Sequence, residues 1–521
     1  MRTWLCLAVV VGTGVVACDD SDAIAPASGG QAGQSGHAGQ GASGAGEGGS
    51  DDGATAGAGA GAFAEAGTGG SSDDSIDDTA GEGGASGAGP GVADDEIISI
   101  AVSPLDLVPA FSSSITDYYV RCDAGANQLT LTTTSASGTS TRNVTLAPDE
   151  QTSVADKYFI RCLPPDFPVI TVTKNGAPTP GYYLSNSANY AMVLDAQGVP
   201  VWYARGTSTL DLDSPAPNTL SFMPNFDDVA ASNFEVRDLD ANTVTLVTGA
   251  AGTPADGHEL QFLPNGHRLI LTTPVVSGVD LTGLKTFGAN QNVLSCNIEE
   301  LDAAGNLVFS WQASDHIDPV QESLVPAQSA AYIDVYHCNS IDADAGGNLL
   351  LSVRFANALY YIDRSTGQVT WKLGGSAYSK DGAALIHVES DAQTTFNLQH
   401  DARFRPNGNV SLFDDHGVAP GVARGIEYAI NHTTGVATPV FQFLGSAAST
   451  REGGFRRYDD GESVICWGNV PTDFRFLTEI DAAGNDVFDL SFSDSTNVAY
   501  RAIKVPLSQF DIAKLRANTA K

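Results

Sequence analysis

The chain reads Val193-Leu194-Asp195-Ala196-Gln197-Gly198, and Trp202 follows four residues later. The same order of an apolar residue, Asp or Asn, a short polar run and Gly returns further along the chain. The clear copies are residues 301–305 before Trp311, 362–367 before Trp371, 430–435 and 480–484, and a weaker copy lies near Asp240. Apolar runs on both sides of a tight turn, in which glycine takes a positive φ, are typical of a β-hairpin. The copies therefore predict a series of hairpins.

A second hairpin pattern alternates with the first. Its turns are Pro264-Asn265-Gly266, Gly346-Gly347-Asn348, Pro406-Asn407-Gly408 and Asp459-Asp460-Gly461, with a degenerate copy at Phe222-Met223-Pro224-Asn225. Two hairpins make one four-stranded unit, and such units recur every roughly 45–70 residues. This repeat predicts an all-β fold, a six-bladed β-propeller, in which closure of the ring protects the sheet edges. No part of the region has a sustained helical period.

The N-terminal residues 1–17 are typical of a signal peptide. Arg2 precedes an apolar run that is too short to cross a membrane. The run ends in Val15-Val16-Ala17-Cys18, which resembles a bacterial lipobox. The resemblance implies cleavage before Cys18 and attachment of lipid to its sulfur. We therefore expect an exported lipoprotein, anchored to a membrane in the periplasm or at the cell surface. An ordinary signal peptide with an incidental Cys18 is the alternative.

Composition divides the remaining chain into three segments. Residues 18–95 are mostly Gly, Ala, Ser and acidic side chains, which bury too little apolar surface to fold, so we expect a disordered tether. Residues 96–165 contain short runs rich in β-branched and aromatic residues, and 107–118 resembles cadherin-like repeats of bacterial surface proteins. This segment is predicted to be a small β-sandwich. The hairpin repeats then occupy residues 166–521.

Charge and cysteine content narrow the partners and the compartment. The net charge of −35 argues against nucleic acid or an anionic lipid surface as a partner, so we expect membrane contact only through the lipid anchor. Disulfides persist in exported proteins. Cys122 and Cys162 end two similar segments and are predicted to pair. The pairing of Cys296, Cys338 and Cys466 stays open, and one of these three must be free.

Three histidines occupy the same place in the repeat. His258, His337 and His400 each stand a few residues before a turn of the second hairpin pattern. This place is the start of a leading strand, and in a propeller the leading strand of each blade lines the central channel. Residues at one phase of a cyclic repeat are then expected at one height around the channel. A single strand histidine is usually structural, but three at one phase favour a functional site.

Arg354 is expected beside this cluster. It ends the return strand of the hairpin that His337 begins, and antiparallel pairing brings those two ends together. A guanidinium among imidazoles suits a tetrahedral oxyanion such as sulfate or phosphate. A three-histidine metal site competes with this interpretation. Against a metal, Arg354 would repel a cation and no carboxylate shares the phase of the histidines, so we expect no metal and no other cofactor. His416, after Asp414-Asp415, is placed to border the pocket.

These residues carry a resemblance to a known family. The motif Phe396-Asn397-Leu398-Gln399-His400-Asp401-Ala402-Arg403-Phe404 resembles the bacterial and fungal arylsulfotransferase family, as do His337-x-Asn339, Ser352-Val353-Arg354 and His258-Glu259. The resemblance covers about Val169 to Ser491. It implies a six-bladed propeller that moves a sulfuryl group from an aryl sulfate to a phenol by a ping-pong route. It also implies independence from the nucleotide donor (PAPS) of cytosolic sulfotransferases, in keeping with the lack of a phosphate-cradling glycine loop.

The resemblance also implies roles for single residues. His400 matches the histidine that accepts the sulfuryl group covalently, as a sulfohistidine. His258, His337 and Arg354 match catalytic groups that also bind the sulfuryl oxygens, and Asn339 matches a substrate-binding position. Which of His258 and His337 protonates the leaving phenolate stays open. The chain departs from the family after Asp414, where Asn is common and this sequence has Asp415-His416.

Two functions of other classes remain as alternatives. The repeats could form a non-catalytic cell-surface binding module with an anion site, or they could support metal-assisted hydrolysis or a lyase reaction. A covalent sulfate adduct on His400 distinguishes the transferase from the binding module. Metal analysis and sensitivity to chelators distinguish it from the metal-dependent enzyme.

Overall fold

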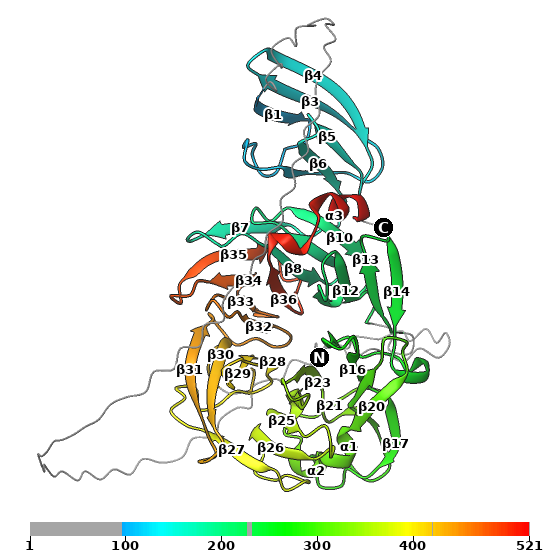
Figure 1. Cartoon of the computed structure of the whole chain (residues 1–521), viewed down its shortest axis with the longest axis vertical. Coiled ribbons are helices and arrows are strands. Elements are labelled where there is room, and N and C mark those ends of the chain that lie inside the picture. The colour runs from blue at the N-terminus through cyan, green and yellow to red at the C-terminus, as the bar shows by residue number, and fades with distance from the viewer. Residues whose placement is uncertain (1–95, 227–231, 419, 520–521) are drawn as a thin grey trace, which may run out of the picture. The chain divides into compact units, whose positions relative to one another are not determined.

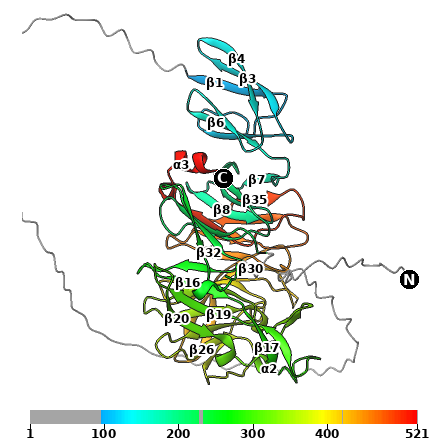
Figure 2. The ribbon, with the colours of Figure 1, turned by 90° about the vertical axis from the view of Figure 1, so that its right-hand side faces the viewer.

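A computed structural model describes residues 96–226, 232–418 and 420–519, all of which fall in one compact unit. Their regular structure is almost entirely β-strand (Figure 1, Figure 2), which confirms the predicted all-β class. The predicted signal peptide, the lipid site at Cys18 and the predicted tether at 18–95 lie outside the described residues. No helix in the described ranges has the length and apolar character needed to span a bilayer.

The first described strands form two three-stranded sheets. One contains β1 (Ile97–Ser103), β3 (Asn127–Ser135) and β4 (Gly138–Leu146), and the other contains β2 (Asp117–Arg121), β6 (Tyr158–Leu163) and β5 (Gln151–Val154). One apolar cluster draws buried residues from both sheets, including Ile100, Leu129, Val120 and Ile160. Cys122 and Cys162 form a disulfide within this cluster, the pair predicted from the sequence.

The strands that follow form four-stranded antiparallel meanders in succession. The first contains β8 (Tyr182–Ser187), β9 (Tyr190–Leu194) and β10 (Pro200–Arg205), with β36 (Ala502–Val505) as its fourth strand. The second contains β11 (Leu210–Asp213), β12 (Thr219–Met223), β13 (Phe234–Asp238) and β14 (Thr243–Val247). The third contains β15 (Leu260–Phe262), β16 (Arg268–Thr272), β19 (Asn297–Leu301) and β20 (Leu307–Gln312).

The later meanders have the same strand order. One contains β23 (Cys338–Ala343), β24 (Leu349–Val353), β25 (Ala358–Ile362) and β26 (Val369–Gly374), and the next contains β28 (His400–Phe404), β29 (Val410–Asp414), β30 (Arg424–Asn431) and β31 (Val436–Leu444). β27 (Ala384–Val388) pairs in parallel with β26 and β31 and so joins these two meanders into one sheet. The last contains β32 (Gly454–Arg457), β33 (Ser463–Cys466), β34 (Arg475–Ile480) and β35 (Asp486–Phe492).

Strands from both ends of the repeat region share sheets. β36 pairs with β8, and β7 (Ile170–Lys174) pairs with β35. These strand pairings place opposite each other residues more than 300 positions apart in the sequence, for example Ala502 and Ser185, or Ser491 and Thr171. After β36 the chain continues through η3 (Leu507–Gln509) and α3 (Ile512–Asn518).

The first hairpin motif forms the turns that the sequence predicts. In the turn between β9 and β10, Oδ1 of Asp195 accepts hydrogen bonds from the backbone N–H groups of Gln197 and Val199. Gly198 takes a φ of 73°, a conformation that L side chains rarely adopt. The degenerate turn predicted at 222–225 is wrong, because β12 runs through Phe222 and Met223. Its hairpin turns instead at residues 214–218.

Two insertions that the repeat did not predict form an additional sheet. One lies between β16 and β19 and contains β17 (Val275–Val279) and β18 (Gln291–Leu294). The other lies between β20 and β23 and contains the short helices α1 (Ala313–His316) and α2 (Pro319–Glu322), then β21 (Ala327–Gln328) and β22 (Ile333–Asp334). The strands of the two insertions pair in the order β17-β18-β22-β21. A disulfide between Cys296 and Cys338 joins the C-terminal ends of the two insertions.

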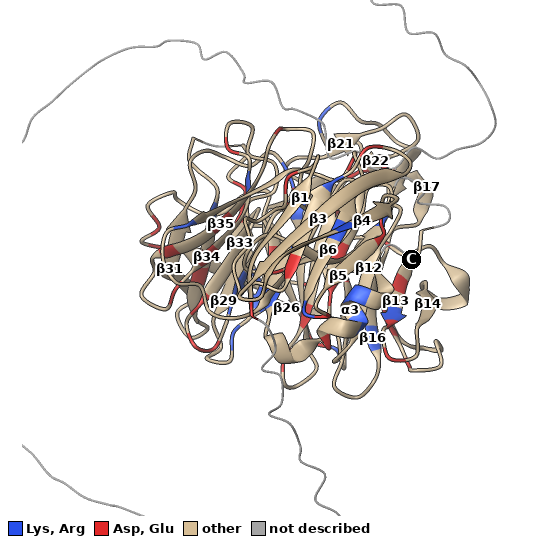
Figure 3. Cartoon of the chain, turned by 90° about the horizontal axis from the view of Figure 1, so that it is seen from above, with Lys and Arg blue, Asp and Glu red and all other residues tan. Residues whose placement is uncertain are grey.

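Acidic and basic residues are interspersed along the strands and loops of the described part of the chain (Figure 3). Two further 3₁₀ turns complete the regular structure, η1 (Ala250–Gly252) and η2 (Arg354–Ala356).

Cys466 is buried and has a free thiol, so it is the odd cysteine that the sequence requires.

Candidate functional site

The three predicted histidines lie together at the starts of three leading strands. His400 is the first residue of β28, His337 directly precedes β23, and His258 precedes β15 by two residues. All three side chains are buried. The ring centroids of His258 and His337 are 5.0 Å apart. Tyr500, which the sequence did not single out, lies between the histidines, with its ring 5.6 Å from that of His258 and 6.5 Å from that of His400.

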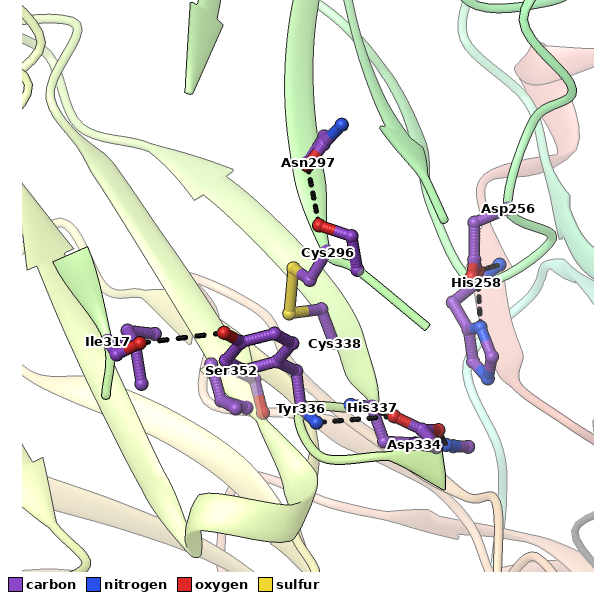
Figure 4. The surroundings of a disulfide bond; sticks show 12 residues. Asp256, His258, Cys296, Asn297, Ile317, Asp334, Tyr336, His337, Cys338 and Ser352 are labelled. Carbon is purple, nitrogen blue, oxygen red and sulfur yellow. Dashed lines mark hydrogen bonds and ion pairs between the residues drawn. A yellow bond between two sulfur atoms is a disulfide. The ribbon is translucent and has the colours of Figure 1, made fainter. Parts of the chain in front are cut away.

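A buried carboxylate holds each of these imidazoles. Nδ1 of His337 lies 2.8 Å from Oδ2 of Asp334, and Nδ1 of His400 lies 2.7 Å from Oδ2 of Asp415. Nδ1 of His258 bonds in the same way to Asp256. Figure 4 shows two of these three pairs near the Cys296–Cys338 disulfide, namely His258 with Asp256 and His337 with Asp334.

None of these carboxylates stands at the histidines' own place in the repeat, but each one contacts a histidine from another position. Asp256 and Asp334 precede their histidines by two and three residues, so a spacing of Asp-x-His and Asp-x-x-His was the available signal. Asp415 reaches His400 from the far end of the hairpin partner β29, and only the strand register places it there. Burial raises the pKa of Asp256, but the charges of His258 and His337 and its hydrogen bonds to His258 outweigh this effect and lower it below the ordinary value.

Arg354 lies next to His337, as the antiparallel register predicts. Its backbone N–H donates to the carbonyl of His337 at 3.0 Å. The guanidinium is buried, donates from Nη2 to the carbonyl of Thr450 at 3.0 Å and lies over the ring of Phe355. Its Nε has no hydrogen-bond partner among the described residues. Arg354 therefore has a donor available for an anion.

Asn339 is fully buried in β23 and connects two of the leading strands. Its Nδ2 donates to the carbonyl of Gln399 at 2.7 Å, directly before His400. The backbone carbonyl of Asn339 accepts a hydrogen bond from the hydroxyl of Tyr500 at 3.1 Å. Oδ1 of Asn339 has no hydrogen-bond partner in the described part of the chain. The side chain thus supports the backbone of His400 and keeps one acceptor unused.

A pocket opens beside two of the histidines. Its lining combines the pairs His258–Asp256 and His337–Asp334 with apolar and small side chains from the insertions and neighbouring loops: Phe226, Thr273, Leu294, Ser295 and Cys338. The lining therefore combines polar groups with aromatic and aliphatic ones. The cavity is small, about 10 Å³, which is room for roughly one water molecule.

A buried network of ion pairs lies next to the histidines. Two of its carboxylates, Glu259 and Asp401, directly follow His258 and His400 in the sequence. Arg501 pairs with Asp211, and it lies 3.2 Å from both Glu259 and Asp401. Arg403 contacts the same two carboxylates, Glu259 at 2.6 Å and Asp401 at 2.8 Å. Burial alone would raise the pKa of Asp401, but the neighbouring guanidiniums hold this pKa well below its usual range. These ion pairs connect several leading strands next to the histidines.

His416 does not join the three histidines. Its Nδ1 lies 3.4 Å from Asp414, and its Nε2 lies 3.0 Å from the carbonyl of Pro420. Asp414 also pairs with Arg424. His416 thus belongs to a neighbouring polar cluster. Within the described ranges, no group of three or more His, Cys, Asp or Glu side chains is placed to hold a metal ion.

Comparison with protein families decides the assignment. The model of the arylsulfotransferase (ASST) family matches residues 231–493, just over half of the 521-residue chain. The chain belongs to the arylsulfotransferase family. The matched range contains the three histidines and Arg354, together with Asp256, Asp334 and Asp415, whereas Tyr500 and Arg501 lie beyond it. No curated protein matches the chain.

Several solved structures resemble this arylsulfotransferase-family protein at low identity. A protein of unknown function from Bacteroides caccae is 11% identical, covers 63% of this chain and 99% of its own, and has a TM-score of 0.40. A streptogramin B lyase is 9% identical, covers 64% of this chain and 98% of its own, and has a TM-score of 0.32. These TM-scores are too low to assign a fold or a function to this chain from the two structures.

Proposed function

We propose that the protein transfers a sulfuryl group from an aryl sulfate to a phenol, with His400 as the covalent acceptor and without a nucleotide donor. The observation that carries this proposal is the buried cluster of His258, His337 and His400 beside Arg354, within the range that matches the arylsulfotransferase family. A neutral imidazole is a competent nucleophile near neutral pH, and a covalent intermediate divides a difficult transfer into two easier steps.

In the first step, the lone pair on Nε2 of His400 attacks sulfur while the bond between sulfur and the aryl oxygen breaks. The bonding electron pair leaves with the phenolate, which takes a proton from His258 or His337. Arg354 and the imidazole donors offset the negative charge on the transferring group. In the second step, a phenol oxygen attacks the same sulfur, the N–S bond breaks, and the lone pair returns to His400. The proton of the acceptor returns to the histidine that acted as the acid, which completes the ping-pong cycle.

The architecture we propose for this enzyme is a six-bladed β-propeller over residues 166–521. The four-stranded meanders would be its blades, and the pairings β36–β8 and β7–β35 support closure of the ring. Residues 96–165 would form a cadherin-like β-sandwich, which their two sheets with a shared core support. Asn339 would contribute its unused acceptor to the substrate site.

We further propose an exported lipoprotein in which residues 1–17 are removed, Cys18 carries the lipid, and residues 18–95 tether the enzyme to the membrane in the periplasm or at the cell surface. The two disulfides of the described residues support export, because such bonds persist in oxidising compartments. Aryl sulfates and phenols would be its small-molecule partners, with no nucleic acid and no cofactor.

The decisive experiment mixes the purified protein with 4-nitrophenyl sulfate and a series of phenols. We expect release of nitrophenolate that depends on the phenol, and a sulfate-mass adduct on His400 when the phenol is omitted. His400→Ala should abolish both. Reversible binding of inorganic sulfate without any adduct would instead indicate a binding module, and loss of turnover with a chelator would indicate a metal-dependent hydrolase.

A further inference from the structure

The three histidines of the site share one contact that sets the position of a proton. Each ring presents Nδ1 to a carboxylate that is itself almost fully buried, and the three partners are Asp256, Asp334 and Asp415. An ionised carboxylate accepts hydrogen bonds but cannot donate them, so Nδ1 must be the donor in each pair. The neutral ring then has its lone pair on Nε2, on the far side of the ring from the carboxylate.

The pair of His400 and Asp415 is built differently from the other two. Asp256 and Asp334 are close in sequence to their histidines, whereas Asp415 directly follows β29, which pairs with β28 through His400 and Phe413. Both side chains of the pair are inaccessible to solvent. The ring of Tyr500 also faces His400, and its hydroxyl donates to the carbonyls of His258 and Asn339. Asp401, the next residue in the chain, is turned toward Arg403, Arg456 and Arg501. Asp415 is therefore the carboxylate that orients this ring.

We propose, on the basis of the sulfuryl transfer above, that Asp415 is a positioning residue that holds the proton of His400 on Nδ1 and so selects Nε2 as the nucleophile. As the Nε2–S bond forms, the imidazole gains positive charge, and the adjacent carboxylate offsets it. No proton has to leave His400 before the attack. Asp256 and Asp334 act in a complementary way. His258 and His337 can donate to a sulfuryl oxygen from Nε2 only as doubly protonated imidazolium, and their carboxylates offset that charge.

The first test reads the tautomer directly and does not depend on turnover. In full-length protein labelled with ¹⁵N-histidine, long-range ¹H–¹⁵N spectra distinguish a proton on Nδ1 from one on Nε2, and loss of signals in His400→Ala assigns the ring. We expect the Nδ1–H form in the wild type. In Asp415→Asn we expect a mixture with the Nε2–H form, because an amide can donate to Nδ1 as well as accept from it. A wild-type ring protonated on Nε2 would overturn the inference.

The second test separates positioning from folding. Asp415→Ala, which removes the acceptor of the Nδ1 proton, should slow formation of the sulfate adduct by about 10²–10⁴-fold while the KM for 4-nitrophenyl sulfate changes little. Asp415→Glu, which keeps the carboxylate, should retain part of the rate. Asp414→Ala is the matched control, because Asp414 is equally buried and also pairs with a histidine, but that histidine lies outside the cluster. This control should keep the wild-type rate of adduct formation.

The two proposals fail in different ways. A wild-type protein with the Nδ1–H tautomer that forms no adduct with any aryl sulfate would contradict the transferase but leave the role of Asp415 intact. Rapid adduct formation by Asp415→Ala would contradict the positioning role and leave the transferase intact. If Asp415→Ala fails to fold, the tautomer of the wild-type protein still decides the inference.

Discussion

At the scale of single residues, each member of the motif Gln399-His400-Asp401-Ala402-Arg403 has a separate contact. Gln399 donates to the hydroxyl of Ser352 at 3.0 Å, and the backbone N–H of Ala402 donates to the hydroxyl of Ser340 at 2.9 Å. Asp401 and Arg403 enter the ion network, and His400 enters the site. The motif is specific because one strand carries both the proposed nucleophile and its anchors to the neighbouring strands.

Tyr500 gives the first prediction at this scale. Its hydroxyl donates to the carbonyls of His258 and Asn339, at 3.0 and 3.1 Å. Tyr500→Phe keeps the ring between the histidines but leaves these buried carbonyls with fewer donors, so we expect a loss of about 1–3 kcal/mol in the free energy of unfolding. Denaturant unfolding measures the loss, and an unchanged midpoint would show that other groups satisfy the two carbonyls.

His416 gives a prediction about pH. Its interaction with Asp414 raises its pKa above the ordinary value, although burial opposes the shift. A raised pKa in the folded state means that protonation of His416 favours folding. Its contribution is complete below the unfolded value of about 6.5 and is lost as the pH rises through the higher folded value.

We therefore expect the Tm of the wild type to fall as the pH rises above neutrality, and His416→Gln to show a smaller fall. Thermal unfolding followed by circular dichroism across this range is the measurement. Parallel curves for the two proteins would contradict the assigned charge state of His416.

At the scale of elements, the two insertions are the main addition to the repeat. Their strands form the sheet β17-β18-β22-β21, and they bring Leu294, Ser295 and Asp334 to the pocket. The Cys296–Cys338 disulfide fastens them where they rejoin the meanders, and Cys338 directly follows His337. The sheet therefore shapes the site although it lies outside the repeated units.

The two disulfides allow a matched comparison. The paired cysteines are 42 positions apart in Cys296–Cys338 and 40 apart in Cys122–Cys162, so in the chain-entropy model each bond contributes about 4 kcal/mol. We expect the double variants Cys296→Ser/Cys338→Ser and Cys122→Ser/Cys162→Ser to lose similar stability. Only the first should lose adduct formation at His400, because only it releases the segment that holds His337. Equal loss of activity in both would show that stability alone accounts for the effect.

At the scale of the whole molecule, Arg501 joins the beginning and the end of the repeat region. It directly precedes β36, which completes the sheet of β8, and its guanidinium reaches Asp211, Glu259 and Asp401 from three other meanders. These carboxylates are buried, and a buried charge without its partner is costly. Arg501 is therefore central to cooperative folding of the region.

Arg501→Met should lower the free energy of unfolding by about 3–5 kcal/mol, since it leaves the carboxylates less compensated. Arg205→Met is the control, because the Arg205–Asp166 pair is about half exposed and such pairs contribute about 1 kcal/mol or less. Denaturant unfolding of both variants tests the difference. Similar losses would mean that Arg501 has no special place in the network.

The sequence by itself determined the all-β class, the hairpin turns and the histidine cluster. Turn chemistry is local, since a positive φ at Gly198 and the Asp195 side chain define one hairpin without distant contacts. Because the hairpins repeat, equivalent positions can be compared from one copy to the next. His258, His337 and His400 could therefore be grouped from the sequence alone.

Only the tertiary structure decided which groups surround those rings. Asp415 reaches His400 through strand register, Tyr500 reaches the cluster from near the C-terminus, and Cys296 reaches Cys338 through two insertions. None of these contacts repeats along the chain, so no period in the sequence reports them. They depend on which distant strands become neighbours, and that is settled by packing of the meanders rather than by any local signal.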